Sequence, residues 1–253
     1  MAGMLQDKVA LVTGGASGIG RATAVAMAAA GAHVAVADLT ADTGLEVVAE
    51  VNALGREALF QPTDVSSAES VDALVDAVIA RWGRLDCAFN NAGIADEGKF
   101  TIDATEENWD RVNGVNLKGV WLCLRREIRE MLKTGGGAIV NTASVAGLVG
   151  WRGSATYSAT KHGVIGLTRT AALEYARQGI RVNAICPGVI DTPMGAPATR
   201  TTGTVHDALL ARHPQGRFGA PEEVAGAVIW LCSDQSTFTN GHALTVDGGY
   251  VAR

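Results

Sequence analysis

Thr13-Gly14-Gly15-Ala16-Ser17-Gly18-Ile19-Gly20 separates a short apolar run from a long helical pattern. Glycines at 14, 18 and 20 let the backbone turn tightly and approach a pyrophosphate, which then rests on the positive end of the following helix. The spacing is G-x-x-x-G-x-G rather than G-x-G-x-x-G, and three glycines can also serve only to pack a helix against a strand. Because the stretch lies between a strand and a helix, we favour a dinucleotide-binding turn.

Short β-branched apolar runs alternate with longer helical patterns along the rest of the chain. Most of these runs are continuously hydrophobic, which is typical of parallel strands that are buried on both faces of a sheet. We therefore expect about seven strands: Lys8–Thr13, His33–Asp38, Glu57–Gln61, Leu85–Asn90, Ala138–Ala143, Ile180–Cys186 and Ala243–Val246.

The segments between these runs have helical periodicity, and some carry helix-start signals. Ser67 precedes one segment as a cap, and Pro221 is followed by two glutamates, which favour a helix N-terminus. The expected helices include Ile19–Ala30, Thr40–Leu54, Ala68–Trp82, Tyr157–Arg177 and Pro221–Leu231. Repeated strand–helix–strand units imply right-handed crossovers. The sequence thus predicts an α/β fold, a single Rossmann-type domain over residues 1–253 with a doubly wound parallel sheet and helices on both faces.

One long segment, about residues 188–219, interrupts this alternation. Proline, threonine, glycine and alanine dominate it, and its only helical pattern is weak, near Val205–Arg212. A loop of this length in a compact domain is usually functional or mobile, although it can be a plain surface excursion. We interpret the segment as a lid over a substrate site.

The composition is that of an ordinary globular protein, with 47% hydrophobic and 19% charged residues among 253. Acids and bases are interspersed to a net charge of −5, so we expect neither nucleic acid nor a membrane as a partner. The four cysteines lie in apolar stretches without a C-x-x-C pair or a nearby histidine cluster. We therefore expect buried free thiols, no metal site and a cytoplasmic location.

An acidic residue, Asp38, stands at the end of the second expected strand, 18 residues after Gly20. A carboxylate there can accept hydrogen bonds from adenosine ribose hydroxyls and repels a 2′-phosphate, unless it is only a solvated strand end. Neither Leu39, which follows, nor Ser17 in the glycine turn supplies a cation for that phosphate. These residues favour NAD(H) over NADP(H).

The sequence resembles the short-chain dehydrogenase/reductase family from about residue 8 to residue 250. The resemblance is carried by Thr13–Gly20, Asn90-Asn91-Ala92-Gly93, Asn116 within Val115-Asn116-Leu117, Ser144, the Tyr157-x-x-x-Lys161 pair and Pro187-Gly188. No single segment is diagnostic, but the combination is specific. The resemblance implies an oxidoreductase that acts on CH–OH groups.

Tyr157 and Lys161 can together provide the acid and base that such a reaction needs. Reduction of a ketone needs a proton donor at the oxygen, and oxidation of the alcohol needs the same group as a base. Free tyrosine has a pKa near ~10, so its base form needs help close to neutrality. Lys161 follows one helical turn later, about 6 Å along the axis, and its cation can favour the tyrosinate. A surface pair at this spacing is the alternative, but Ser144 at a strand end and the glycine turn favour catalysis.

The resemblance assigns catalytic roles to Asn116, Ser144, Tyr157 and Lys161. In the family, the matching lysine also bonds the nicotinamide ribose, the serine holds the substrate oxygen, and the asparagine supports a water-linked proton relay. The resemblance further implies cofactor contacts from Gly14, Ser17, Gly18, Ile19, Asp38, Leu39, Asp64, Val65, Asn90, Ala92, Gly93, Tyr157, Lys161, Pro187, Gly188, Ile190 and Thr192. Thr192 can instead cap a local turn.

The resemblance places Ala95, Val145, Leu148, Trp151 and Met194 around the substrate. This set is largely apolar and offers no cation for a carboxylate or phosphate, although each residue can instead belong to the core. We expect a small, mostly apolar ketone or secondary alcohol as the partner molecule.

Two other functions stay open at this point. A 3-oxoacyl thioester reductase of fatty-acid metabolism would normally prefer NADPH, which Asp38 disfavours. A non-catalytic dinucleotide-binding module would not need both Tyr157 and Lys161. By analogy with the family we also expect a homotetramer, which the small residues Ala159, Gly163 and Gly166 would permit through close helix packing.

Overall fold

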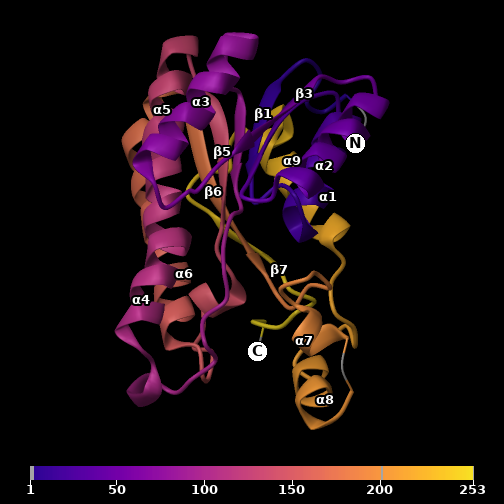
Figure 1. The fold of residues 1–253 in the computed structure, drawn as a ribbon, viewed down its shortest axis with the longest axis vertical. Helices are drawn as coiled ribbons and strands as arrows, with labels where there is room; N and C mark the ends of the chain where they lie inside the picture. Colours follow the sequence, from indigo (N-terminus) through magenta and orange to yellow (C-terminus); the bar gives the residue numbers. More distant parts are fainter. Residues whose placement is uncertain (1–2, 201, 253) are drawn as a thin grey trace.

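Seven parallel strands form the centre of the computed structural model, which describes residues 3–200 and 202–252 (Figure 1). Residues 1–2, 201 and 253 of the predicted domain lie outside the described part. The strands are β1 (Val9–Thr13), β2 (His33–Asp38), β3 (Ala58–Pro62), β4 (Cys87–Asn90), β5 (Gly137–Thr142), β6 (Ile180–Pro187) and β7 (Ala243–Val246). Their order is β3-β2-β1-β4-β5-β6-β7, so the chain reverses its direction of progress between β1 and β4. The predicted sheet is confirmed, and a ligand crevice is expected at that reversal.

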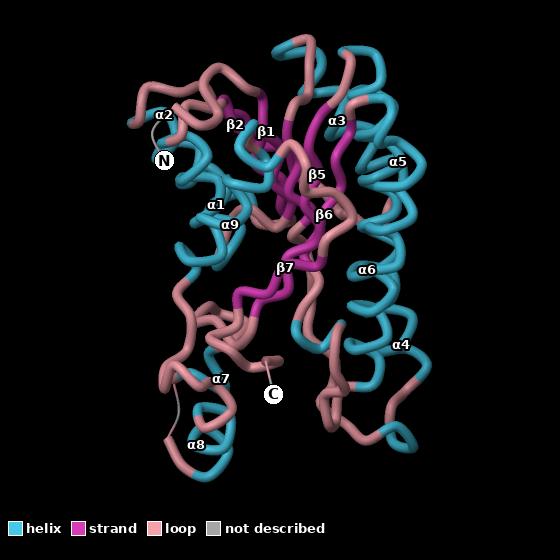
Figure 2. Tube along the Cα trace, turned by 180° about the vertical axis from the view of Figure 1, so that it is seen from behind, coloured by secondary structure: helices cyan, strands magenta, loops and turns pink. Residues whose placement is uncertain are grey.

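Helices cover both faces of this sheet, as the sequence predicts (Figure 1 and Figure 2). One layer consists of α1 (Gly18–Ala29), α2 (Ala41–Ala53) and α9 (Pro221–Cys232). The opposite layer consists of α3 (Ala68–Trp82), α4 (Glu106–Asn113), α5 (Val120–Thr134) and α6 (Ala155–Tyr175). Short helical turns complete the chain: η1 (Thr101–Asp103), η2 (Gly114–Gly119), η3 (Val145–Gly147), η4 (Ala176–Gln178) and η5 (Asp234–Ser236).

The central strand β1 explains why its sequence is continuously apolar. All five of its residues are buried, and successive side chains enter different cores. Val9 and Leu11 join the core under α3, α5 and α6, whereas Ala10 and Val12 join the core under α1 and α9. A strand with helices on both faces therefore has no polar face.

The two predicted helix starts are present. The Ser67 hydroxyl accepts a hydrogen bond from the Ser70 N–H at 3.3 Å, which caps α3. Pro221 is the first residue of α9, and the Glu223 carboxylate accepts from the Ala220 N–H at 2.8 Å. Both contacts satisfy N–H groups that a helix leaves without intrahelical partners.

The predicted lid segment, residues 188–219, contains two short helices that lie together at one end of the molecule (Figure 1). The weak helical pattern corresponds to α8 (Thr204–Leu210), whereas α7 (Ala196–Thr199) is too short to have been recognised. A bridge between Ile190 and Gly219, with the Asp191 N–H donating to the Gly219 carbonyl at 2.9 Å, joins the two ends of the segment.

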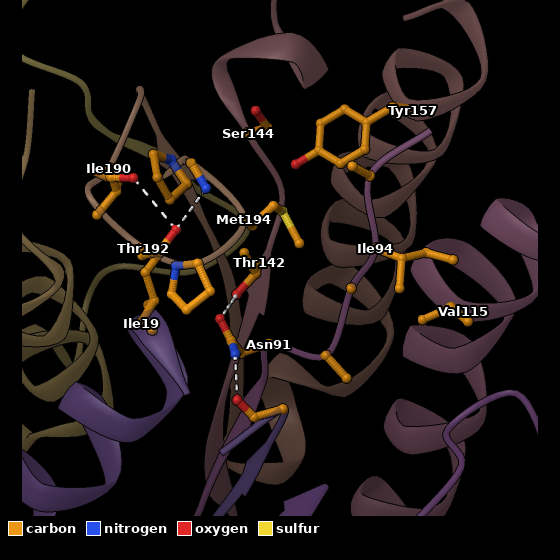
Figure 3. Close-up of a pocket in the computed structure, with 18 of the residues that line it drawn as sticks. Ile19, Asn91, Ile94, Val115, Thr142, Ser144, Tyr157, Ile190, Thr192 and Met194 are labelled. Carbon is orange, nitrogen blue, oxygen red and sulfur yellow. Dashed lines mark hydrogen bonds between the residues drawn. The ribbon is translucent and has the colours of Figure 1, made fainter. Parts of the chain in front are cut away.

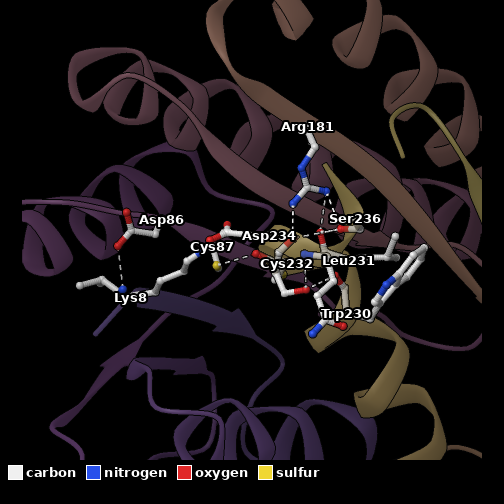
Figure 4. Close-up of polar contacts among 12 residues, drawn as sticks. Lys8, Asp86, Cys87, Arg181, Trp230, Leu231, Cys232, Asp234 and Ser236 are labelled. Atoms are coloured by element: carbon white, nitrogen blue, oxygen red, sulfur yellow. Dashed lines mark hydrogen bonds and ion pairs between the residues drawn. The ribbon is translucent and has the colours of Figure 1, made fainter. Parts of the chain in front are cut away.

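Polar contacts tie β1, β4 and β6 to the end of α9 (Figure 4). Arg181 donates to the Leu231 carbonyl at 2.7 Å, and Lys8 pairs with Asp234 at 2.6 Å. The Cys87 thiol contacts the Cys232 carbonyl at 3.7 Å, and all four cysteines are buried and free, as expected. Within the described residues, no helix is both long and apolar enough to cross a membrane, and no metal-binding cluster is found.

Candidate active site

A cavity of about 570 Å³ opens between the glycine turn, the carboxyl ends of the strands, the start of α6 and the lid segment. Most of the predicted site residues line it: Gly14, Ser17, Gly18, Ile19, Asp38, Leu39, Asp64, Val65, Ala92, Gly93, Ala95, Ser144, Trp151, Tyr157, Lys161, Pro187, Gly188, Ile190, Thr192 and Met194. Figure 3 shows the part of the cavity where Ser144, Tyr157 and Met194 approach one another. The fold therefore brings together residues that are far apart in the sequence.

The glycine turn forms a cradle that larger residues would fill. Gly14 and Gly18 have φ angles of +61° and +51°, which L-residues rarely adopt. A Cβ on Gly20 would lie 2.0 Å from the Gly14 carbonyl oxygen, so α1 could not pack this close to the turn. The Ser17 side chain does not cap α1, and Ser17 lines the cavity with Gly18 and Ile19. The positive end of the helix is thus directed at the cavity, which suits a phosphate.

Asp38 stands at the end of β2 beside this cradle. Its Oδ2 accepts from the Ala16 N–H at 3.1 Å and its Oδ1 accepts from the Thr40 N–H at 3.2 Å, which orients the carboxylate. Asp38 and Asp64 line this end of the cavity, and Lys161 is the only cation among the described lining residues. These carboxylate acceptors fit a ribose whose hydroxyls are free, and no described lining residue at this end offers a cation for a 2′-phosphate.

Ser144, Tyr157 and Lys161 meet at the other end of the cavity. The Ser144 hydroxyl interacts with the Tyr157 phenol and accepts from the Ala146 N–H at 3.1 Å. Lys161 is buried, its Nζ lies 5.4 Å from the centre of the Tyr157 ring, and it donates to the Thr142 carbonyl at 2.8 Å. This arrangement can hold a proton on the phenol and place a hydroxyl beside it.

The protonation of this pair differs from our expectation. Burial raises the pKa of Tyr157 to about 12, and the Asp96 charge acts in the same direction, whereas the Ser144 hydrogen bond lowers it. Burial lowers the pKa of Lys161 to about 8. We expected Lys161 to favour the tyrosinate, but desolvation dominates for both groups in this structure.

Two predicted asparagines do not line the cavity. The Asn116 side chain, in η2, accepts from the Ile94 N–H and donates to the Ile94 carbonyl, both at 2.8 Å. It therefore fixes the loop that carries Gly93. The Asn90 Nδ2 donates to Glu127 and Asn141 at 3.0 Å in a buried cluster, so its side chain is directed at these residues.

The predicted substrate residues divide into two groups. Ala95, Trp151 and Met194 line the cavity. Val145 and Leu148 do not: Val145 is buried, and Leu148 packs against the core.

Thr192 combines the two roles considered for it. It lines the cavity, and its hydroxyl also accepts from the Gly195 N–H at 3.1 Å, which stabilises a local turn (Figure 3).

Several lining residues were missed, among them Thr63, Asn91, Ile94, Asp96, Val115, Thr142, Ala143, Ser154, Val189, Pro193, Gly195, Ala198 and Leu209. Asn91 belongs to a motif already quoted, and its Nδ2 donates to the Thr13 and Gly14 carbonyls at 3.2 Å, which fixes the glycine turn. Asp96 follows that motif by three residues, and this proximity was the available signal. The lid residue Leu209 gave no comparable signal.

Comparison with known proteins shows which family this chain resembles. A family model described as enoyl-(acyl carrier protein) reductase matches residues 14–251. Cyclohexanol dehydrogenase of Acinetobacter sp. (strain SE19) is 43% identical over 253 residues, with 100% of this chain and 98% of the relative covered. A 3-oxoacyl-[acyl-carrier-protein] reductase of Thermotoga maritima is 40% identical, with 98% of this chain and 99% of the relative covered.

Solved structures agree with these sequence matches. The crystal structure of levodione reductase superposes with a TM-score of 0.93 at 40% identity, covering 98% of this chain and 99% of that chain. A putative 2-deoxy-d-gluconate 3-dehydrogenase from Agrobacterium tumefaciens, with bound NADP, has a TM-score of 0.90 at 37% identity, with 98% of each chain covered.

Proposed function

The chain belongs to the short-chain dehydrogenase/reductase family and is an oxidoreductase of secondary alcohols and the matching ketones, and we propose that NAD(H) carries the hydride. The observation that carries the proposal is the cavity that joins the glycine cradle and Asp38 to Ser144, Tyr157 and Lys161. A cofactor cradle and a proton donor in one cavity are what hydride transfer to a carbonyl requires.

When bound, the dinucleotide supplies the hydride donor or acceptor. Ser144 holds the substrate oxygen, and the Tyr157 phenol exchanges a proton with that oxygen. In alcohol oxidation the phenolate takes the hydroxyl proton as the carbinol carbon loses hydride, and in ketone reduction the phenol returns it. The Lys161 Nζ lies 5.4 Å from the centre of the Tyr157 ring, and by the family resemblance this lysine binds the nicotinamide ribose. Asn116 supports the Gly93 loop and, by the family resemblance, a proton relay.

Asp38 supports NAD over NADP because its fixed carboxylate would meet a 2′-phosphate without a lining cation nearby. The Agrobacterium relative was solved with NADP, so the preference needs its own test. We expect kcat/KM with NAD to exceed that with NADP in the wild-type protein, and Asp38→Ala to narrow the ratio about tenfold or more. An unchanged ratio would refute the ribose argument.

The substrate end of the cavity favours an alicyclic, neutral substrate. Ile94, Ala95, Trp151, Met194 and Leu209 provide apolar walls there. Cyclohexanol dehydrogenase and levodione reductase, named above, act on compounds of this kind by their names. We take residues 188–219 as the lid of one domain, because Met194 and Leu209 bring this segment against the cavity.

The alternatives have less support. A 3-oxoacyl thioester reductase has a relative at 40% identity, but Asp38 disfavours the NADPH such an enzyme would normally use. A non-catalytic module is disfavoured because Ser144, Tyr157 and Lys161 converge in one cavity.

The decisive experiment is a panel of cyclic and open-chain secondary alcohols and ketones, assayed by absorbance with the oxidised and reduced forms of NAD and NADP. Tyr157→Phe should lose roughly 100- to 10,000-fold in turnover while it binds NAD normally, because only the proton-transfer group is removed. Unchanged turnover would contradict the acid–base role, and inactivity of the wild-type protein across the panel would contradict the proposed function.

Assembly and location complete the proposal. Large apolar side chains are exposed on the α4, α5 and α6 layer at Trp109, Trp121 and Leu173, a pattern that supports a homotetramer. The four buried free thiols support a reducing compartment, which we take to be the cytoplasm.

A further inference from the structure

Asp96 connects the loop after β4 to the start of α6. Its Oδ2 accepts from the Tyr157 N–H at 3.2 Å, and its Oδ1 accepts from the Ser154 hydroxyl at 2.7 Å and the Gly98 N–H at 3.3 Å. Ser154 is the N-cap residue of α6, but its side chain makes no cap hydrogen bond to the helix. A carboxylate from another segment thus performs the capping, and it does so at the residue that carries the phenol.

The same carboxylate also lies in the cavity that contains the phenol. Asp96 lines this cavity, and its charge raises the pKa of Tyr157 in addition to the larger effect of burial. The other described groups that face Tyr157 are the Lys161 cation on its own helix and the Ser144 hydroxyl after β5. The Cys186 thiol of β6 acts on Lys161 rather than on the phenol.

Asp96 lies on a different part of the fold from the other acidic residues that line the cavity. Asp38 is the last residue of β2 and Asp64 follows β3, on the far side of the sheet, whereas α6 packs against β5 and β6. Asp96 is therefore the one carboxylate of the described lining that contacts the first turn of the catalytic helix.

We propose that Asp96 is a positioning residue: it anchors the first turn of α6, disfavours ionisation of the Tyr157 phenol through its negative charge, and thereby sets the pH range of catalysis. This inference rests on the proposed function, since it assumes that Tyr157 exchanges the proton. Asp96 holds the phenol in its acid form, which favours ketone reduction, and alcohol oxidation accordingly needs a higher pH.

Asp96→Asn tests the proposal because the amide oxygen can still accept a hydrogen bond while the charge is lost. Alcohol oxidation should rise with pH as the phenol ionises, and ketone reduction should fall. In Asp96→Asn both profiles of kcat/KM should move to lower pH by roughly 0.5 to 1 unit, as expected for loss of one nearby charge. Affinity for NAD should stay within about twofold, because Asp96 lies away from the cradle.

Glu97→Gln is the matched control. It removes a carboxylate one residue away that pairs with Lys99 at 2.8 Å and accepts from the Thr105 hydroxyl at 2.8 Å, outside the cavity. Both profiles should keep their midpoints. An equal shift in Glu97→Gln would show a general charge effect and overturn the proposal, as would an unmoved or upward-shifted midpoint in Asp96→Asn.

A second measurement, made without cofactor, tests the inference independently of enzyme activity. The ultraviolet absorbance of phenolate, compared with that of Tyr157→Phe, isolates Tyr157 from the chain's two other tyrosines. Near pH 11 the ionised fraction should be about three- to fivefold higher in Asp96→Asn, and an equal fraction would overturn the proposal. If Asp96→Asn does not fold, Asp96→Ser replaces it in both measurements. If the ionised fraction does not change while Tyr157→Phe still abolishes turnover, only the role proposed for Asp96 is refuted. An inactive wild-type protein would instead refute the proposed function.

Discussion

At the scale of single residues, the most unusual group outside the cavity is Glu127 on α5. It is completely buried, its Oε2 accepts from the Asn90 Nδ2 at 3.0 Å, and its Oε1 has no partner. Asn141 links the same asparagine to the Thr168 hydroxyl on α6, so the cluster joins β4, β5 and two helices. Burial raises the pKa of Glu127 to about 7, since no cation compensates for the lost hydration.

This carboxyl predicts a specific pH dependence of stability. Near pH 4 it is protonated in both the folded and unfolded states. Between about 4.5 and 7 only the unfolded state releases the proton, so the free energy of unfolding falls as pH rises. Glu127→Gln should remove this loss and be more stable than the wild-type protein at pH 8.5 by up to about 3 kcal/mol, measured by urea unfolding.

Glu130→Gln is a control for which we expect the opposite change in the free energy of unfolding. Glu130 pairs with Arg126 and with Lys133 at 2.8 Å, and these cations lower its pKa despite partial burial. Its stabilisation is present above the unfolded pKa and is lost as pH falls, so Glu130→Gln should destabilise the protein at pH 8.5. A Glu127→Gln protein that is also less stable at pH 8.5 would contradict the assignment.

Residue-scale prediction from the sequence succeeded where a motif places a side chain at the end of a strand. Asp38 and Ser144 reach the cavity for that reason. It failed where a residue distant in the sequence decides the direction of a side chain. Asn90 and Gly93 belong to one quoted segment, yet Asn90 turns toward Glu127, whose partnership no local pattern reveals.

At the scale of elements, α1 depends on Gly20 for its approach to the glycine turn. A Cβ there would overlap the Gly14 carbonyl oxygen at 2.0 Å and the Asn91 Nδ2 at 2.7 Å. Gly20→Ala should therefore displace the helix and weaken NAD binding about 100-fold, measured by titration calorimetry. Gly114→Ala is a matched control, because its Cβ would meet only the Ser66 side chain at 3.9 Å. Equal affinities in the two variants would show that α1 does not need this contact.

The strands and the long helices were predictable from the sequence, and the short helical turns were not. Strand positions followed from continuous apolar runs, with ends within two residues of those expected. The π-helical turn η2, which holds Asn116, has no signature in the sequence. The position of η2 follows from tertiary packing: a Cβ on Gly119 would lie 2.9 Å from a Val65 methyl group, so only glycine allows this contact.

At the scale of the whole molecule, the outer face of α6 determines how copies of the chain can associate. We expected Ala159, Gly163 and Gly166 to form one small-residue surface. The structure divides them: a Cβ on Gly163 would lie 2.8 Å from Leu117 of the same chain, whereas Ala159 and Gly166 are exposed. Gly163 is therefore needed within the chain, and the predicted partner contact narrows to the exposed positions and Leu173, which is 85% exposed.

Gly166 offers a direct test of the assembly. A Cβ there meets nothing within 4 Å, so Gly166→Gln should leave the isolated chain intact, with an unchanged circular dichroism spectrum. If α6 pairs with a second copy, the added side chain would separate the helices at their closest approach. Sedimentation at micromolar concentration should then give about four times 26.1 kDa for the wild-type protein and smaller species for Gly166→Gln. A monomeric wild-type protein would reject the tetramer, and an undisturbed tetramer of Gly166→Gln would move the interface away from α6.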